Sequence, residues 1–188
     1  MLDKLVFDIE TKNTFADVGG QDRVHDLEVS FVGVYSYNQD KYLSFFEDKM
    51  KELGELFKTA GLIIGFAINR FDVPVLNKYF DYDLFKIPRL DLLDEVELNA
   101  GQRIGLDVLA KTNLGVGKTS HFPDVITFYK EKNWKALENY CLNDVKITKD
   151  LYELAKKRGY LIMPQRHTGN LLRVQFKFED LIFHPTLF

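Results

Sequence analysis

The alternation of apolar and polar residues near the start of the chain predicts a buried β-strand. Leu5, Phe7 and Ile9 fall on one face of the segment 5–10, because side chains two residues apart on a strand point the same way. Later apolar segments predict more strands, and the first two of these form a hairpin around a polar turn. These further strands span residues 27–37, 41–46, 62–66 and 89–93.

Other segments have the spacing of amphipathic helices, and they span residues 48–59, 73–80, 106–112 and 133–158. A hairpin followed by alternating strands and helices predicts an α/β domain with a mixed sheet. Residues 172–178 also alternate, which predicts an extra edge strand or a segment that docks on a partner chain. We therefore expect one domain over residues 1–160 and a C-terminal extension over 161–188, either an added strand or a tail for self-association or a protein partner.

Composition narrows the class of protein. With 46% hydrophobic residues the chain can bury a core, and its single cysteine excludes an internal disulfide. No apolar run reaches the roughly 18–20 residues of a membrane span, and the charged Asp3 and Lys4 argue against a secretory signal. We therefore expect a soluble cytoplasmic protein without membrane contact. Cys141 and Trp134 are expected in the core.

The net charge of −3 argues mildly against a protein that coats nucleic acid. It does not exclude an enzyme that acts on nucleic acid, because carboxylates gathered to hold cations make such a domain acidic. Two windows lack Asp and Glu and contain basic residues. The window 155–177 includes Lys156, Arg166 and Arg173, and the window 108–123 includes Lys111, Lys118 and His121. Either window could follow a phosphate backbone or be a solvated surface.

Several carboxylates stand where the pattern predicts apolar side chains. Asp8 and Glu10 are two residues apart in the first strand, so both project from one face at a spacing of about 6.5–7 Å. Burying them side by side is costly unless a positive charge compensates. The alternative is that this face of the strand is exposed to solvent.

Asp144 interrupts the apolar stripe of the long helix, and Tyr140 lies one turn earlier on nearly the same side. An acid on a buried stripe needs a partner such as a metal ion, whereas a local salt bridge is the alternative. Asp72 follows the buried strand 62–66, at the edge where open α/β sheets place their sites, but it could also cap the next helix. The stripe comprises Leu137, Cys141, Asp144, Thr148, Leu151 and Ala155.

Together these segments resemble the motifs of the DEDDy group of 3′–5′ exonucleases, which are similar to the proofreading domains of family B DNA polymerases. The motifs occur in the family's order over about residues 4–155. Tyr140 matches the tyrosine form, because the alternative form needs His where this chain has Asn139. The resemblance implies a ribonuclease H-like fold with a five-stranded mixed sheet flanked by helices. The three segments are Phe7-Asp8-Ile9-Glu10-Thr11, Phe71-Asp72-Val73-Pro74 and Tyr140-Cys141-Leu142-Asn143-Asp144.

The resemblance implies an enzyme that hydrolyses phosphodiester bonds at the 3′ end of single-stranded DNA or RNA with two divalent cations, Mg²⁺ or Mn²⁺. Asp8 would contact both ions, Glu10 and Asp144 would hold the ion on the nucleophile side, and Asp72 would hold the other ion through water. Tyr140 would orient the attacking water. The residues expected to contact substrate are Thr11, Phe71, Lys118 and His121.

One departure from the family keeps alternatives open. The family usually carries Asn four or five residues before the second-motif Asp, where this chain has Ile68 and Ala67. A catalytically inactive nucleic-acid-binding domain of the same fold is therefore one alternative, and an endonuclease or resolvase is another. Residues 115–119 resemble a phosphate-binding loop, but the first Gly of that motif and a preceding strand are both missing.

Overall fold

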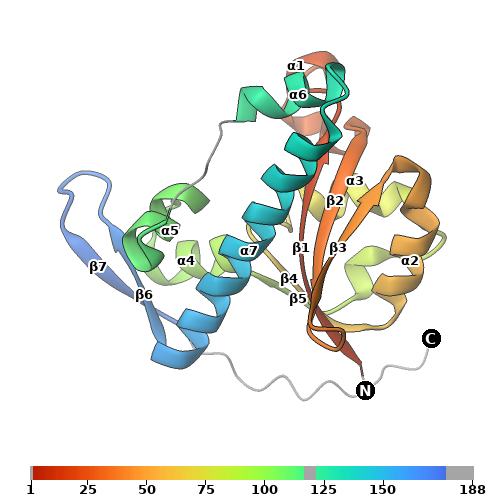
Figure 1. Cartoon of the computed structure of the whole chain (residues 1–188). Helices are drawn as coiled ribbons and strands as arrows, with labels where there is room; N and C mark the ends of the chain where they lie inside the picture. Colours follow the sequence, from red (N-terminus) through yellow and green to blue (C-terminus); the bar gives the residue numbers. More distant parts are fainter. Residues whose placement is uncertain (1, 117–121, 177–188) are drawn as a thin grey trace.

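A computed structural model describes residues 2–116 and 122–176 of the chain, the side chains of residues 122–124 excepted (Figure 1). Its main sheet has the strand order β3-β2-β1-β4-β5. β1 pairs in antiparallel fashion with β2 and in parallel with β4, so the predicted mixed sheet is confirmed. The strands are β1 (Asp3–Thr11), β2 (Val29–Ser36), β3 (Lys41–Phe46), β4 (Ala60–Gly65) and β5 (Arg89–Asp91).

Alternate residues of β1 face two different layers of the protein. Leu5, Phe7 and Ile9 lie in a core with residues of α2 (Met50–Lys58) and α3 (Asp72–Leu76), as the sequence pattern predicts. Val6 lies in a second core with residues of α7 (Trp134–Arg158). Figure 1 shows α7 crossing one face of the sheet and α2 covering the other. Because Asp8 and Glu10 lie two and four residues after Val6 on the strand, their side chains point to the same face as Val6, which is the α7 face.

α7 approaches the sheet closely at Gly33 of β2, which pairs with Asp8. A Cβ atom added to Gly33 would lie 3.0 Å from the Leu142 side chain, 3.1 Å from that of Val145 and 3.2 Å from the Cys141 sulfur. Glycine therefore lets the helix pack directly over the middle of the sheet. This close packing places the middle of α7 beside the carboxylates of β1.

The helix that follows β5 differs from the prediction. Asp91 accepts a hydrogen bond from the backbone N–H of Leu93 at 2.9 Å, which caps the first turn of a helix. Residues 92 and 93 are therefore helical and do not extend the strand. The remaining α-helices are α1 (Phe15–Val18), α4 (Leu92–Ala100), α5 (Leu106–Leu114) and α6 (Phe122–Lys130). Short 3-10 turns span Gln21–Asp26, Glu47–Lys49, Asn77–Tyr79 and Leu84–Lys86.

A second sheet follows α7. β6 (Tyr160–Pro164) and β7 (Leu171–Gln175) form an antiparallel hairpin. Leu161 and Val174 are buried in the same core as α5 and α7. A C-terminal strand is thus confirmed at residues 171–175, but it lies in a separate sheet with β6, which was not predicted. The division at residue 160 falls where β6 begins and stays a prediction, and residues 177–188 lie outside the described residues. Among the described helices, none is both long and apolar enough to cross a bilayer.

Candidate active site

The carboxylates predicted from the sequence meet in one pocket of about 160 Å³ on the α7 side of β1. Three separate segments contribute: the end of β1, the loop that leads from β4 into α3, and the middle of α7. Thr11 and Phe71, which we expected to contact substrate, also line this pocket. Lys118 and His121 lie outside the described residues. The lining residues are Asp8, Ile9, Glu10, Thr11, Phe66, Ala67, Phe71, Asp72, Tyr140 and Asp144.

Asp8 and Glu10 form the first part of the pocket. Their carboxylates and the sulfur of Cys141 offer ligand atoms that lie within 4.8 Å of one another. The Cys141 thiol has one proton, which lies within hydrogen-bond reach of two Asp8 oxygens: the backbone oxygen, 3.2 Å from the sulfur, and Oδ2, 3.5 Å from it. Burial, and then the charge of Asp8, raise the pKa of the Cys141 thiol well above its usual range. Without a bound cation the sulfur is therefore a protonated donor to Asp8.

Asp72 reaches the pocket from the opposite layer of the protein. Its Oδ1 accepts a hydrogen bond from the backbone N–H of Ile9 at 3.1 Å, so the carboxylate is fixed to β1 between Asp8 and Glu10. Asp72 is itself the first residue of α3 and forms no side-chain cap. The alternative that Asp72 serves as a helix cap is therefore wrong. Burial, followed by the charge of Asp8, raises the pKa of Asp72 well above its usual range.

Asp144 and Tyr140 complete the pocket from α7. Both side chains are buried, with exposed fractions of 3% and 6%. Because they are four residues apart on the helix, they lie on the same face one turn from each other. The orientation predicted for this helix is confirmed, since every member of the stripe is buried. The stripe comprises Leu137, Cys141, Asp144, Thr148, Leu151 and Ala155.

Asp91 holds the loop that leads from β4 into the pocket, a role that the sequence analysis did not predict. Its carboxylate accepts hydrogen bonds from the backbone N–H groups of Ala67 at 2.8 Å and Asn69 at 2.9 Å. These bonds fix the loop that carries Phe71 and Asp72. Ala67 has a φ of 69°, a left-handed conformation that Asn adopts more readily than Ala. Thus one of the two positions where the family usually has Asn retains a backbone conformation that suits Asn.

The charges of the pocket fit divalent cations. Among the described residues that line it, none is Lys, Arg or His, whereas four are carboxylates. Carboxylates gathered in a buried site need a compensating positive charge. Hard oxygen ligands of this kind suit Mg²⁺ or Mn²⁺. The residues present therefore fit the cations that the sequence motifs imply.

Comparison with known proteins agrees with this geometry. The sequence pattern of the RNase H superfamily matches residues 5–156. The chain belongs to the RNase H superfamily. The predicted ribonuclease H-like fold is thereby confirmed, and this fold is of a nuclease type.

A solved structure supports the same fold. The chain is similar to the family B DNA polymerase from the hyperthermophilic archaeon Pyrobaculum calidifontis, with a TM-score of 0.62 and 18% sequence identity. The similarity covers 83% of this chain and 25% of the polymerase, so the chain spans about a quarter of that protein. We find no match among curated proteins.

Proposed function

We propose that this chain is a metal-dependent 3′–5′ exonuclease that acts on single-stranded ends of DNA or RNA. The observation that carries the proposal is the meeting of Asp8, Glu10, Asp72, Asp144 and Tyr140 in one pocket. Membership of the RNase H superfamily supports a nuclease. The direction of attack rests on the resemblance of the three motifs to the DEDDy group.

In this proposal the four carboxylates hold two divalent cations, Mg²⁺ or Mn²⁺. When bound, such ions neutralise the charge on phosphate and lower the pKa of water. Asp72 is held in place by the N–H of Ile9, and Asp8 is held by the thiol of Cys141. The chain therefore fixes both carboxylates before any cation binds.

Tyr140 has a different role in the proposal. A phenol with a pKa of about 10 is a poor base at neutral pH. We therefore assign Tyr140 to orienting the attacking water through a hydrogen bond rather than to taking its proton. Thr11 and Phe71 would contact the terminal nucleotide from the pocket wall. The Phe71 ring packs edge-on against Phe15 at 5.9 Å, which fixes its orientation.

The test is a time course on 5′-labelled single-stranded DNA and RNA with Mg²⁺, Mn²⁺ or EDTA. We expect a ladder that shortens from the 3′ end, needs the cation and is absent in Asp8→Ala. Asp81→Ala is the matched control, because Asp81 has a side chain that is 85% exposed, and it should keep full activity. Cleavage by Asp8→Ala at the wild-type rate would refute the proposal. Internal fragments would indicate an endonuclease or resolvase. Binding of the nucleic acid without cleavage would indicate an inactive nucleic-acid-binding domain.

A further inference from the structure

A second pocket lies beside the acidic pocket, around the single tryptophan of the chain. It has a volume of about 420 Å³ and is mostly apolar. Trp134 is 42% exposed, so the expectation that it lies in the core is wrong. It is the first residue of α7, where the helix has only begun to pack on the sheet. The residues that line this Trp134 pocket are Ser30, Phe46, Glu47, Asp48, Lys49 and Trp134.

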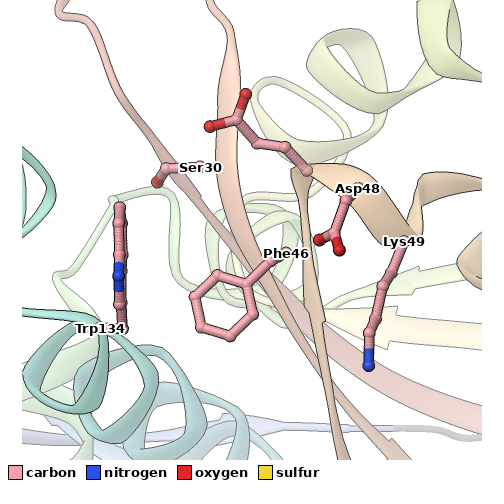
Figure 2. A pocket seen from close by; sticks show the side chains of 6 residues that line it. Ser30, Phe46, Asp48, Lys49 and Trp134 are labelled. Carbon is pink, nitrogen blue, oxygen red and sulfur yellow. The ribbon is translucent and has the colours of Figure 1, made fainter. Parts of the chain in front are cut away.

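The aromatic rings around this pocket are fixed. The Trp134 indole packs edge-on against Phe46 with a centroid distance of 6.0 Å and against Tyr129 at 5.7 Å. Figure 2 shows Trp134 on one side of the pocket, Phe46 at its centre, and Asp48 and Lys49 on the other side. A rigid indole beside an open space is a surface on which a flat ring can stack.

A β-bulge brings Ser30 to the same pocket. Glu10 pairs with Phe31 and Thr11 pairs with Val29, so Ser30 is the extra residue on β2. Bulges re-aim a side chain and are common next to active sites. Ser30 is 1% exposed, and its hydroxyl has no hydrogen-bond partner among the described residues. Figure 2 shows this hydroxyl turned to the Trp134 side of the pocket. Because an unsatisfied buried hydroxyl is unfavourable, a ligand that supplies a hydrogen bond is favoured here.

A layer of packed aromatic residues lies between the two pockets. Phe31, the partner of Glu10 in the sheet, lies in one cluster with Tyr140 and packs edge-on against Phe46 at 4.9 Å. Phe46 is two strands away from Glu10, or about 9–10 Å. Trp134 precedes Tyr140 by six residues of α7, or about 9 Å along the helix. With a rise of about 3.4 Å per stacked nucleotide, this separation spans no more than about three nucleotides.

The charges of the Trp134 pocket favour a base on one side and a phosphate on the other. The Glu47 carboxylate is engaged by the Lys12 ammonium at 2.7 Å and by the Tyr129 hydroxyl at 2.8 Å. Asp48 adds a second carboxylate to the lining, and Lys49 is the one basic residue among the described residues that line the pocket. Carboxylates accept hydrogen bonds from the exocyclic amino groups of bases. A nucleobase therefore fits on the Trp134 side of the pocket, and its phosphate fits on the opposite side near Lys49.

We propose that the Trp134 pocket binds a nucleobase of the single strand, one to three nucleotides upstream of the 3′ end held in the acidic pocket. The base stacks on the Trp134 indole and forms a hydrogen bond with the Ser30 hydroxyl. Stacking of this kind tolerates any base, because every base has an aromatic face. The inference rests on the proposed function for the presence of the strand, and it assigns a binding site outside the carboxylate cluster.

Because Trp134 is the single tryptophan, its fluorescence reports directly on this pocket. The first experiment titrates the Asp8→Ala protein in Mg²⁺ with single-stranded DNA and follows tryptophan emission, while fluorescence anisotropy of the labelled DNA reports binding. We expect saturable quenching that weakens when abasic sites replace the second to fourth nucleotides from the 3′ end. DNA that binds without quenching would overturn the proposal. Quenching by a lysine-rich peptide but not by DNA would also overturn it, in favour of a cationic protein partner.

The second experiment compares Trp134→Leu with Phe85→Leu, a control at an equally exposed ring that lines neither pocket. For Trp134→Leu we expect the KM for single-stranded DNA to rise about tenfold, as loss of one base–aromatic stack implies. The kcat should not change, and Trp134→Phe should restore most of the affinity. The p-nitrophenyl ester of thymidine monophosphate, which fills only the acidic pocket, should be hydrolysed at the wild-type rate.

Substrate with abasic sites should remove the difference in KM between wild type and Trp134→Leu. An equal KM for the two proteins on intact DNA would overturn the inference. Quenching without any cleavage by the wild-type enzyme would refute the proposed exonuclease and leave the base site standing. Cleavage without quenching would refute the base site and leave the proposed exonuclease standing.

Discussion

Gly65, the last residue of β4, controls how the loop bearing Phe71 and Asp72 leaves the sheet. A Cβ atom added at Gly65 would lie 2.1 Å from the Ile68 side chain and 3.1 Å from the backbone oxygen of Phe7. Ile68 is fully buried. The Phe7 oxygen belongs to β1, which pairs with β4. Gly65→Ala therefore forces Ile68 and its loop to move.

The cost follows from overpacking of a buried site. Such substitutions destabilise a protein by about 1–3 kcal/mol. For a chain of this length each kcal/mol lowers Tm by about 2–4 °C, so we expect a loss of roughly 2–12 °C. Gly105→Ala is the matched control, because an added Cβ there meets no atom of the described residues within 4 Å. Its φ of −77° also suits alanine, and its Tm should change by less than about 3 °C.

Activity should fall in parallel with the shift of the loop. The Ile68 oxygen accepts a hydrogen bond from the Val73 N–H at 2.9 Å, next to Asp72. Movement of Ile68 thus displaces the Asp72 carboxylate relative to Ile9. We expect Gly65→Ala to lose most cleavage at a temperature where it is still folded, as followed by circular dichroism and the 3′-end assay. An unchanged Tm would refute the packing argument, and full activity in the folded variant would refute the link to Asp72.

Three further substitutions test the site. Tyr140→Phe should slow turnover and leave cation binding intact, measured by the Mg²⁺-dependent rise in Tm; a loss as complete as that of Asp8→Ala would show that the phenol does more than orient water. Burial raises the pKa of Asp72 in the folded chain, so without cations the folded chain holds this proton more tightly and its stability falls as pH rises. Asp72→Asn should therefore be inactive but more stable than wild type, as measured by urea unfolding at neutral pH in EDTA. Equal stability of the two proteins would contradict the raised pKa. Ala67→Gly should gain about 1 kcal/mol in the same urea assay, because Ala67 has a φ of 69° and alanine is disfavoured there; a loss of stability would contradict this reasoning.

Periodicity was sufficient to predict the elements that carry the candidate site. Leu5, Phe7 and Ile9 mark one face of β1, so the opposite face of Asp8 and Glu10 follows from the strand period. The stripe of α7 likewise fixes which side of the helix bears Asp144. These are local patterns, and each needs only the geometry of one element. The convergence of the three segments followed from their resemblance to the DEDDy motifs.

Other features depend on contacts between distant residues, and no local pattern indicates them. Asp91 caps α4, a role typical of Asp before an apolar run, yet its bonds to Ala67 and Asn69 connect residues more than twenty positions apart. The bulge at Ser30 is a property of the register between β1 and β2. Trp134 is apolar and was expected in the core, but its exposure is decided by where α7 begins relative to the sheet edge.

The register of β1 connects stability to function in this fold. Leu5, Phe7 and Ile9 build the core with α2 and α3, and the even-numbered Asp8 and Glu10 face α7. A slip of one residue would exchange the two sets and place the carboxylates in the apolar layer. Asp72 opposes such a slip, because its carboxylate crosses from the α3 layer to the N–H of Ile9. The same hydrogen bond that supplies the third carboxylate of the candidate site therefore also fixes the strand that supplies the first two.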